Sequence, residues 1–261
     1  VIEGCEEGEP QRVRIQLLVP SEDSRAFDSA VIGEAIEADF NGSPTGHPID
    51  GDARAPTVDE WLVNGTVSNE SYDYPPADAE IDRALDACDE FTALDETVTE
   101  PGVHCVDEID SDHHFDTSTG DIDVVVRDSF ELPSGNGNLS VTGGNDLTIY
   151  ADTDFEMQGN AAIGNESDAL QTRLVFSSEA TVQTVSGTPA INALLYAPES
   201  TVNLNGTPTV VGTVVGDRVV ISDAAIEIRG DGSLEALEFI PEAGPQVPYP
   251  DFTVYEAEID D

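Results

Sequence analysis

The densest group of metal-ligating side chains is His113-His114, with Asp112 and Asp116 beside it and His104 upstream. Imidazole and carboxylate groups are the ligands that bind divalent metals such as zinc. The chain carries 54 acidic residues, however, so an acid next to a histidine is expected by chance. We therefore expect neither a metal centre nor any other cofactor.

Aspartates at predicted turns offer oxygen ligands of the kind that Ca²⁺ prefers. Asp50, Asp52 and Asp231 are such residues, as is the Asp121/Asp123 pair. They lack the regular Gly-Gly-x-Gly-x-Asp repeat of calcium-binding β-rolls. We interpret them as solvated surface.

Paired carboxylates could also cleave a polysaccharide, but such sites normally need aromatic or basic side chains to hold the sugar. The chain has one Trp, six Tyr and nine basic residues. Trp61 stands in the stretch Val58-Asp59-Glu60-Trp61-Leu62-Val63, which we interpret as a packed strand. No Gly-rich phosphate loop, Gly-x-Ser-x-Gly motif or Cys-x-x-Cys motif is present. The sequence predicts no enzyme and no catalytic residue.

Two of the three cysteines are predicted to pair. Cys88 and Cys105 are near one another in the sequence and flank a predicted helix and turn, a spacing that suits a local disulfide. Two buried free thiols are the alternative. Cys5 is left as an unpaired thiol, an intermolecular bridge or a lipid attachment site.

Four acceptor motifs for N-glycosylation, Asn-x-Ser/Thr, begin at Asn64, Asn69, Asn138 and Asn165, and two more, at Asn41 and Asn205, are each followed by a Pro that disfavours modification. Together with the cysteines they favour an exported protein, at the cell surface or on a virion. The chain begins at Val1 without an initiator Met, which suggests that a leader or anchor has been removed.

The charge is extreme: 54 acidic residues face nine basic ones, all of them Arg, for a formal charge of −45. Such a charge is tolerable where salt screens it, since the Debye length is about 3 Å at 1 M. An acidic disordered tail would need low hydrophobicity, whereas 39% of this chain is hydrophobic. We expect a folded, halophilic protein that binds neither nucleic acid nor anionic membranes. No run of about 18 apolar residues exists to span a bilayer.

Short apolar segments from residue 121 onward recur at a fixed spacing. Segments 174–176, 194–196 and 214–216 align at one common interval, and Thr181-Val182 and Thr201-Val202 follow at the same interval. The corner Gly187-Thr188-Pro189 recurs as Gly206-Thr207-Pro208. Such periodicity predicts stacked repeats, here a right-handed parallel β-helix in which Leu174 lies beneath Leu194 and Leu194 beneath Val214. A β-sandwich with coincidental spacing is the alternative.

The front of the chain carries fainter copies of the same unit, with an apolar-x-Gly-x-apolar pattern in segments 31–36, 49–53 and 63–67. The pattern breaks at about residues 72–119. That break holds the one predicted helix, which follows Pro75-Pro76 and has Ile81, Leu85 and Cys88 on one face. We expect this helix to lie across the β-helix or to cap its open end.

The chain thus divides into an N-terminal strand or linker (1–29), a β-helix domain (30–240) with the helical insertion, and a C-terminal segment (241–261). Alternation predicts strands at both ends, at residues 12–17 and 253–259. The C-terminal strand follows a Pro-rich stretch and has Thr253, Tyr255, Ala257 and Ile259 on one face. Either the terminal strands pair within the molecule or one adds to a sheet edge of a neighbouring subunit.

The stretch Ala193 to Gly206, with its Leu-Tyr-Ala-Pro core, and the following Val211-Gly212-Thr213-Val214-Val215-Gly216 resemble a known family. They are similar to the β-helical ectodomains of haloarchaeal pilin-like and pilus-associated surface proteins. The similarity covers about residues 30–235. It implies a right-handed β-helix displayed on a cell surface or appendage, with no known enzymatic activity. The hydrophobic pilin-type helix expected ahead of such an ectodomain is missing from this chain.

These observations predict a non-enzymatic, glycosylated structural protein of a haloarchaeal surface filament, pilus-like appendage or stalk, whose partners are copies of itself or other surface proteins. A glycan- or host-binding spike is the first alternative, favoured if Tyr72, Tyr74 and Trp61 share a concave patch. A polysaccharide-active enzyme is the second, favoured if two carboxylates face each other in a groove.

Overall fold

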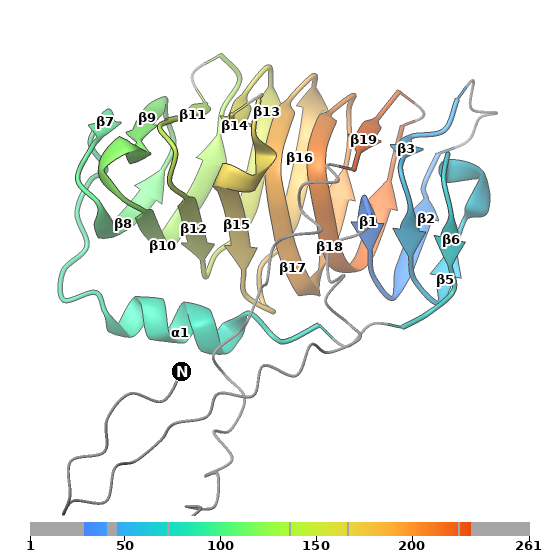
Figure 1. Ribbon diagram of the computed structural model, residues 1–261, viewed down its shortest axis with the longest axis horizontal. Helices are drawn as coiled ribbons and strands as arrows, with labels where there is room; N and C mark the ends of the chain where they lie inside the picture. Colours follow the sequence, from blue (N-terminus) through green and yellow to red (C-terminus); the bar gives the residue numbers. More distant parts are fainter. Residues whose placement is uncertain are drawn as a thin grey trace, which may run out of the picture.

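A computed structural model describes residues 29–40, 46–71, 74–135, 137–165, 167–223 and 225–230 (Figure 1). This part of the chain is mostly β, with one α-helix and three short 3-10 helices, η1 (Glu60–Leu62), η2 (Thr117–Thr119) and η3 (Ala169–Gln171). Every pairing between its named strands is parallel. A sandwich of antiparallel sheets is therefore wrong. The predicted terminal strands lie outside the described residues.

The strands form three parallel ladders around one apolar core, and each strand pairs with the strand one turn further along. Ladder 1 is the longest. It contains, in stacking order, β8 (Gly102–Ile109), β10 (Ile122–Leu132), β12 (Leu147–Ala151), β15 (Thr172–Phe176), β17 (Ala190–Leu204), β18 (Thr209–Ile221), β1 (Val31–Ile32), β4 (Ala53–Arg54) and β6 (Val67–Ser68).

The long strands turn corners and so enter more than one ladder. Ladder 2 joins the later parts of β8, β10, β17 and β18 to β13 (Phe155–Gly159), β16 (Val182–Gly187), β2 (Ala35–Ala38) and β5 (Thr57–Val58). Ladder 3 joins the first parts of β17 and β18 to β7 (Thr97–Val98), β9 (His113–Asp116), β11 (Asn138–Thr142), β14 (Ala162–Gly164), β19 (Glu227–Arg229) and β3 (Ile49–Asp50).

The predicted strands stack as expected, but the spacing between them is not strictly constant. Leu174 pairs with Leu195, and Leu195 with Val214, so the first interval is one position longer and the second one position shorter than the common interval that the sequence predicts. Leu194 instead pairs with Arg173 and Thr213. Because side chains alternate along a strand, this shift by one position puts Leu194 on the outer face. The predicted column Leu174–Leu194–Val214 is therefore wrong by one position.

The inner faces of the ladders pack into a single core. Three phenylalanines lie at its centre: the ring centroids of Phe130 and Phe155 are 4.7 Å apart, and those of Phe155 and Phe176 are 5.5 Å apart. All three are at most 1% exposed. Burial of aromatic rings in contact supplies much of the stabilisation of such a core.

The N-terminal strands complete the stack at the end where the C-terminal strands stop. β19 pairs with β3, and β18 pairs with β1 and β2. The backbone N–H of Gly230 donates to the carbonyl of Asp50 at this junction. The faint repeats at 31–67 are thus true turns of the stack, and they follow β19 in space although they precede it in sequence (Figure 1).

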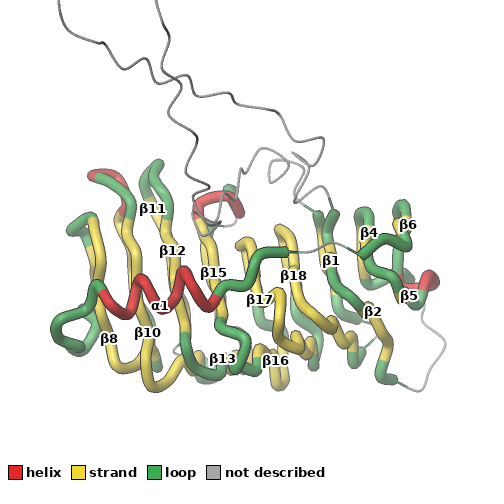
Figure 2. Tube along the Cα trace, turned by 90° about the horizontal axis from the view of Figure 1, so that it is seen from below, coloured by secondary structure: helices red, strands yellow, loops and turns green. Residues whose placement is uncertain are grey.

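The chain then returns to the other end along the outside of ladder 1. Helix α1 (Asp78–Asp86) lies across the outer face of β8, β10, β12 and β15 (Figure 2). The insertion is shorter than the predicted 72–119, because strands β7, β8 and β9 already occupy residues 97–116. We call residues 74–91 of this return segment, which include α1, the strap.

Candidate functional site

The histidines of the densest ligand-like group, His113 and His114, make hydrogen bonds to neighbouring turns. The His113 ring lies 2.9 Å from the Asp95 carbonyl through Nδ1, and the His114 ring 2.9 Å from Ser140 Oγ. Their side chains point to opposite faces of β9, because adjacent strand residues do. No group of three potential ligands that could hold a metal ion occurs within the described residues.

The corner aspartates bind backbone N–H groups and amides of the neighbouring turn. Asp52 Oδ1 accepts from the N–H of Thr66 at 2.7 Å, and Asp121 Oδ1 from that of Asp146 at 3.0 Å. Asp50 Oδ1 accepts from the side chain of Asn64. Such bonds satisfy donors at the corners, where the strand ladder is interrupted. Asp231 lies outside the described residues.

The strap is fixed to ladder 1 at both ends. A disulfide joins Cys88 to Cys105 of β8, with the Cα atoms 5.8 Å apart, as the spacing of the two cysteines predicts. At the other end, Tyr196 Oη donates to the Pro75 carbonyl at 2.6 Å. Asp78 accepts from both the N–H and the Oγ of Ser178, at 2.7 and 2.6 Å. These contacts tie the first turn of the stack to turns in its middle.

Apolar side chains fill the space between the strap and ladder 1. The outward residues of successive turns form a second apolar cluster with the strap residues Ala77 and Ile81, and they come from four strands of the ladder: Val175, Leu194, Tyr196, Val215 and Ile32. Strands buried on both faces read as continuous apolar runs rather than alternating ones. The continuous apolar run Ala193–Ala197 could therefore have indicated that the outer face of β17 is covered.

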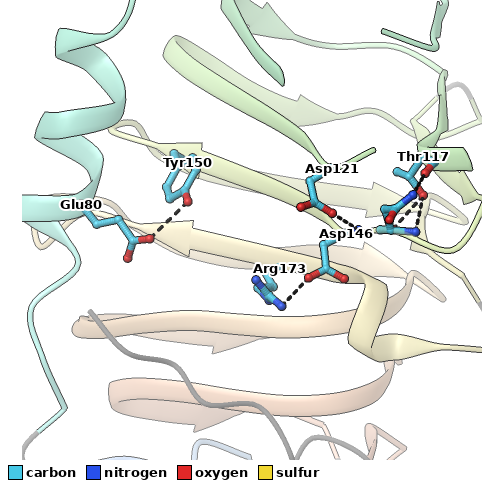
Figure 3. A network of polar contacts seen from close by, with 7 residues as sticks. Glu80, Thr117, Asp121, Asp146, Tyr150 and Arg173 are labelled. Carbon is cyan, nitrogen blue, oxygen red and sulfur yellow. Dashed lines mark hydrogen bonds and ion pairs between the residues drawn. The ribbon is translucent and has the colours of Figure 1, made fainter. Parts of the chain in front are cut away.

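Polar groups extend this contact toward β10 and β12 (Figure 3). Tyr150 Oη donates to Glu80 Oε1 at 3.2 Å, and Arg173 donates to Asp146 Oδ2 at 2.6 Å. The hydroxyl of Thr117 donates to the Asn145 carbonyl at 2.7 Å in the adjoining turn. Sequence reasoning missed Glu80 and Tyr150, because nothing in their local sequence shows that they meet.

Burial shifts the acidity of three groups in this network. It raises the pKa of Glu80, an effect that the hydrogen bond from Tyr150 and the charge of Arg83 partly oppose. It also raises the pKa of Asp123, and the nearby charge of Asp121 adds to that shift. The pKa of Tyr150 is raised by burial and by the charge of Glu80. Raised carboxyl pKa values are typical of active sites, but structural networks produce them too.

The geometry favours the structural reading of these carboxylates. A cavity of about 240 Å³ at the β8 end of the stack is lined by none of these three groups. Its lining comes from the first turn: Glu90, Thr92, Ala93, Leu94, Asp95, Val98, Val103, His104, Cys105 and Val106.

The aromatic residues proposed for glycan binding are separated. Trp61 is 38% exposed, in η1 at the β6 end, and packs edge-to-face on Phe40 at 5.4 Å. Tyr74 packs instead on Tyr196 beside the strap, with the ring centroids 6.0 Å apart. The two therefore do not form one patch, and Tyr72 lies outside the described residues.

The four glycosylation motifs differ in accessibility. Asn64 and Asn69, near the β6 end, and Asn138 are exposed, whereas Asn165 is half-buried. The amide of Asn138 donates to Asp112 and accepts from the N–H of Ala162, and the amide of Asn165 donates to Gln171. Asn69 has the least engaged side chain of the four among the contacts described. The predicted assembly residues Thr253, Tyr255, Ala257 and Ile259, like Cys5, lie outside the described residues.

Among the described helices, none has the length and apolar character needed to cross a membrane. No curated protein and no solved structure matches the chain. One family does, and its matched region, residues 63–237, runs from the last described turn through the strap to the end of β19 and just beyond. The chain belongs to this family, described as a domain of unknown function (DUF7305).

Proposed function

We propose that this protein is a non-enzymatic structural subunit of an extracellular filament, pilus-like appendage or stalk of a salt-loving archaeon. We propose further that its fold is a right-handed parallel β-helix, and that its partners are copies of itself. The observation that carries the proposal is the uninterrupted parallel stacking of the turns around one filled core.

Such a stack is suited to bearing load along one axis. Each turn is joined to the next by main-chain hydrogen bonds in three ladders and by side chains packed at interior density. The strap adds a covalent attachment at the first turn and hydrogen bonds near the middle. A rod of this kind needs no ligand cavity, and the half-buried Glu80 and Asp123 lie at the contact between the strap and ladder 1.

Two features support a place outside the cell. Structural disulfides persist in oxidising compartments and are rare in the cytosol. Exposed Asn64 and Asn69 offer acceptor sites at the β6 end. The acidic surface, with no Lys in the whole chain, supports a high-salt environment.

The test is imaging of the native material. We expect negative-stain electron microscopy of cells, with antibody labelling against residues 74–230, to mark filaments or stalks. Label found only in the cytosol would overturn the proposal. Label spread evenly over the envelope, with isolated particles after extraction, would overturn the filament but leave a surface protein.

A second function is favoured by one observation, the exposed Trp61 at the end of the stack. Aromatic faces exposed at a tip are suited to stacking on sugar rings, so an adhesin or spike is the alternative. Binding to a glycan array that is lost in Trp61→Ala but kept in Val185→Ala, a second exposed apolar residue, would favour it.

A further inference from the structure

The first turn of the stack presents an incomplete sheet edge. Strand β8 pairs with β10 along its length, but among the described residues only Thr92 pairs with β8 on the opposite side. Val103 of this strand is 50% exposed, and the 240 Å³ cavity lies between β8 and residues 90–95. A long edge strand with unfilled pairing capacity is a template for an added strand.

The surroundings of this edge are strongly acidic. Residues 86–110 carry no Lys or Arg, and their nine acids are Asp86, Asp89, Glu90, Asp95, Glu96, Glu100, Asp107, Glu108 and Asp110. The described Arg127, on the adjoining strand, is already paired with Asp107 and Asp128. An added strand must therefore bring positive charge or meet repulsion.

One segment of this chain has the matching character. Residues 10–21 contain two arginines and no acid, and they alternate as Arg12-Val13-Arg14-Ile15-Gln16-Leu17. The C-terminal candidate strand, residues 251–261, instead carries five acids. At 1 M salt charges act only over about 3 Å, so arginines need direct contact with carboxylates, which strand pairing gives.

The length of the segment before β1 decides whether the added strand binds the β8 edge of its own copy or that of another copy. Six ladder spacings separate Val31 from His104, so an added strand at the β8 edge lies about 34 Å from β1. Residues 20–29 span at most about 35 Å when fully extended. Within one copy the connection would be stretched to its limit. The β6 end lies only two spacings from β1, about 10 Å, so the β8 end of a copy stacked there is within easy reach.

The strands at the β6 end are poor templates themselves, because β5 and β6 have two residues each. We propose, as a deepening of the filament function above, that residues 11–19 of one copy add as a strand to the acidic β8 edge of the next copy. Each subunit then offers a donor strand near one end and an acceptor edge at the other. Such a head-to-tail contact continues without closing and builds a filament.

Photo-crosslinking of the full chain tests this. A benzoylphenylalanine replaces Val103, and the matched control places it at Val185, also on a strand and 39% exposed. Equal amounts of unlabelled and ¹⁵N-labelled protein are mixed in molar salt, irradiated and analysed by mass spectrometry. We expect position 103, and not 185, to crosslink to residues 11–19, with mixed-isotope products showing that two copies are joined.

Variants that reverse the charge of two arginines provide a second test. Arg12→Glu/Arg14→Glu should lower the crosslink yield about tenfold, whereas Arg218→Glu/Arg229→Glu, with the same change of charge, should leave it within about twofold. Crosslinks confined to one copy, crosslinks to residues 251–261, or equal loss in both charge variants would overturn the inference. If filaments are still seen on cells in that case, the proposed function stands and only the connector is wrong.

Discussion

Glu80 and Asp123 differ from the solvated acids because each is half-buried, Glu80 in the strap and Asp123 on β10. Burial raises both pKa values, so the folded state holds a proton on these groups at a higher pH than the unfolded chain does. Their contribution to stability is therefore present at low pH and is lost as pH rises through the folded pKa. At neutral pH each carboxylate opposes docking of the strap.

Glu80→Gln should remove this opposition while keeping an acceptor for Tyr150. We expect the free energy of unfolding at pH 7 to be unchanged or higher by a few tenths of a kcal/mol, since the site is partly solvated. The gain over the wild type should vanish as the pH falls through the raised pKa of Glu80, because the wild-type carboxyl is then neutral as well. Thermal unfolding in molar salt measures it, with the exposed Asp82→Asn as the matched control. A variant less stable than the wild type at pH 7 would contradict this account.

Gly187 marks a corner where successive turns touch. Its φ is +90°, and a Cβ added there would lie 2.4 Å from the Gly159 carbonyl oxygen. Gly206 of the next turn, with φ +76°, stacks on Gly187 in turn. The recurring Gly-Thr-Pro corner thus reflects a steric requirement, because side chains are strained at positive φ and backbone packs against backbone.

Gly187→Ala should cost about 2 kcal/mol and lower the midpoint of thermal unfolding by about 4–8 °C. Gly144→Ala is the control, since a Cβ there meets nothing within 4 Å. Similar midpoints for the two variants would show that the corner tolerates a side chain.

The strap connects the turn at the β6 end of the stack to the turn at the β8 end. It carries the chain from the last described turn back to the first, and the Cys88–Cys105 disulfide closes that path. A terminal turn of a stacked fold unfolds more easily than an inner turn, because it packs against one neighbouring turn only. The strap opposes fraying at the β8 end.

Cys88→Ser/Cys105→Ser should lower the free energy of unfolding by about 3 kcal/mol, the value for a closed loop of about 15 residues. Amide hydrogen exchange should rise first in β7 and β8 and only later in β17 and β18. The control is Cys5→Ser, expected to leave both measurements unchanged. Uniform acceleration across all strands would mean that the disulfide does not protect a local unit.

The sequence predicted the helix and the strands from residue 121 onward, but it missed β7, β8 and β9 and did not predict the register. Alignment of the recurring apolar segments identified the right ladders, because β-branched runs and Gly corners return once in each turn. The unequal intervals on either side of Leu195 depend on the lengths of the loops, which apolar patterning alone does not resolve. Both Leu194 and Leu195 are buried, Leu194 beneath the strap and Leu195 in the core. Their hydrophobicity therefore does not reveal which of the two faces inward.

The contacts of the candidate site were predictable only where sequence separation is short. Cys88 and Cys105 lie at a sequence separation of 17, so a local disulfide was a reasonable prediction. Asp78 and Ser178 lie at a separation of 100, and Glu80 and Tyr150 at 70, so those contacts need the fold first. The partner of His114 likewise comes from a neighbouring turn, which the local sequence does not reveal.

At the scale of the molecule, net charge sets the conditions under which the stack is stable. The chain carries a formal charge of −45, and four of its described arginines, Arg127, Arg173, Arg218 and Arg229, already form ion pairs. Repulsion among the remaining acids is screened only in salt.

Removing salt should therefore loosen the fold. We expect the far-ultraviolet circular dichroism of the strands to fall and the unfolding midpoint to drop when molar KCl is dialysed away, with recovery on its return. Sucrose at equal osmolarity is the control for general exclusion effects. A spectrum unchanged in salt-free buffer would contradict the halophilic interpretation.

In the proposed filament, the stack of turns lies along the filament axis. Its strands would then run across the axis and repeat along it at about 4.8 Å. Averaged power spectra from cryo-electron microscopy of native filaments measure this directly. We expect a strong meridional reflection at about 4.8 Å. A reflection of that spacing on the equator, or filaments without it, would contradict the account.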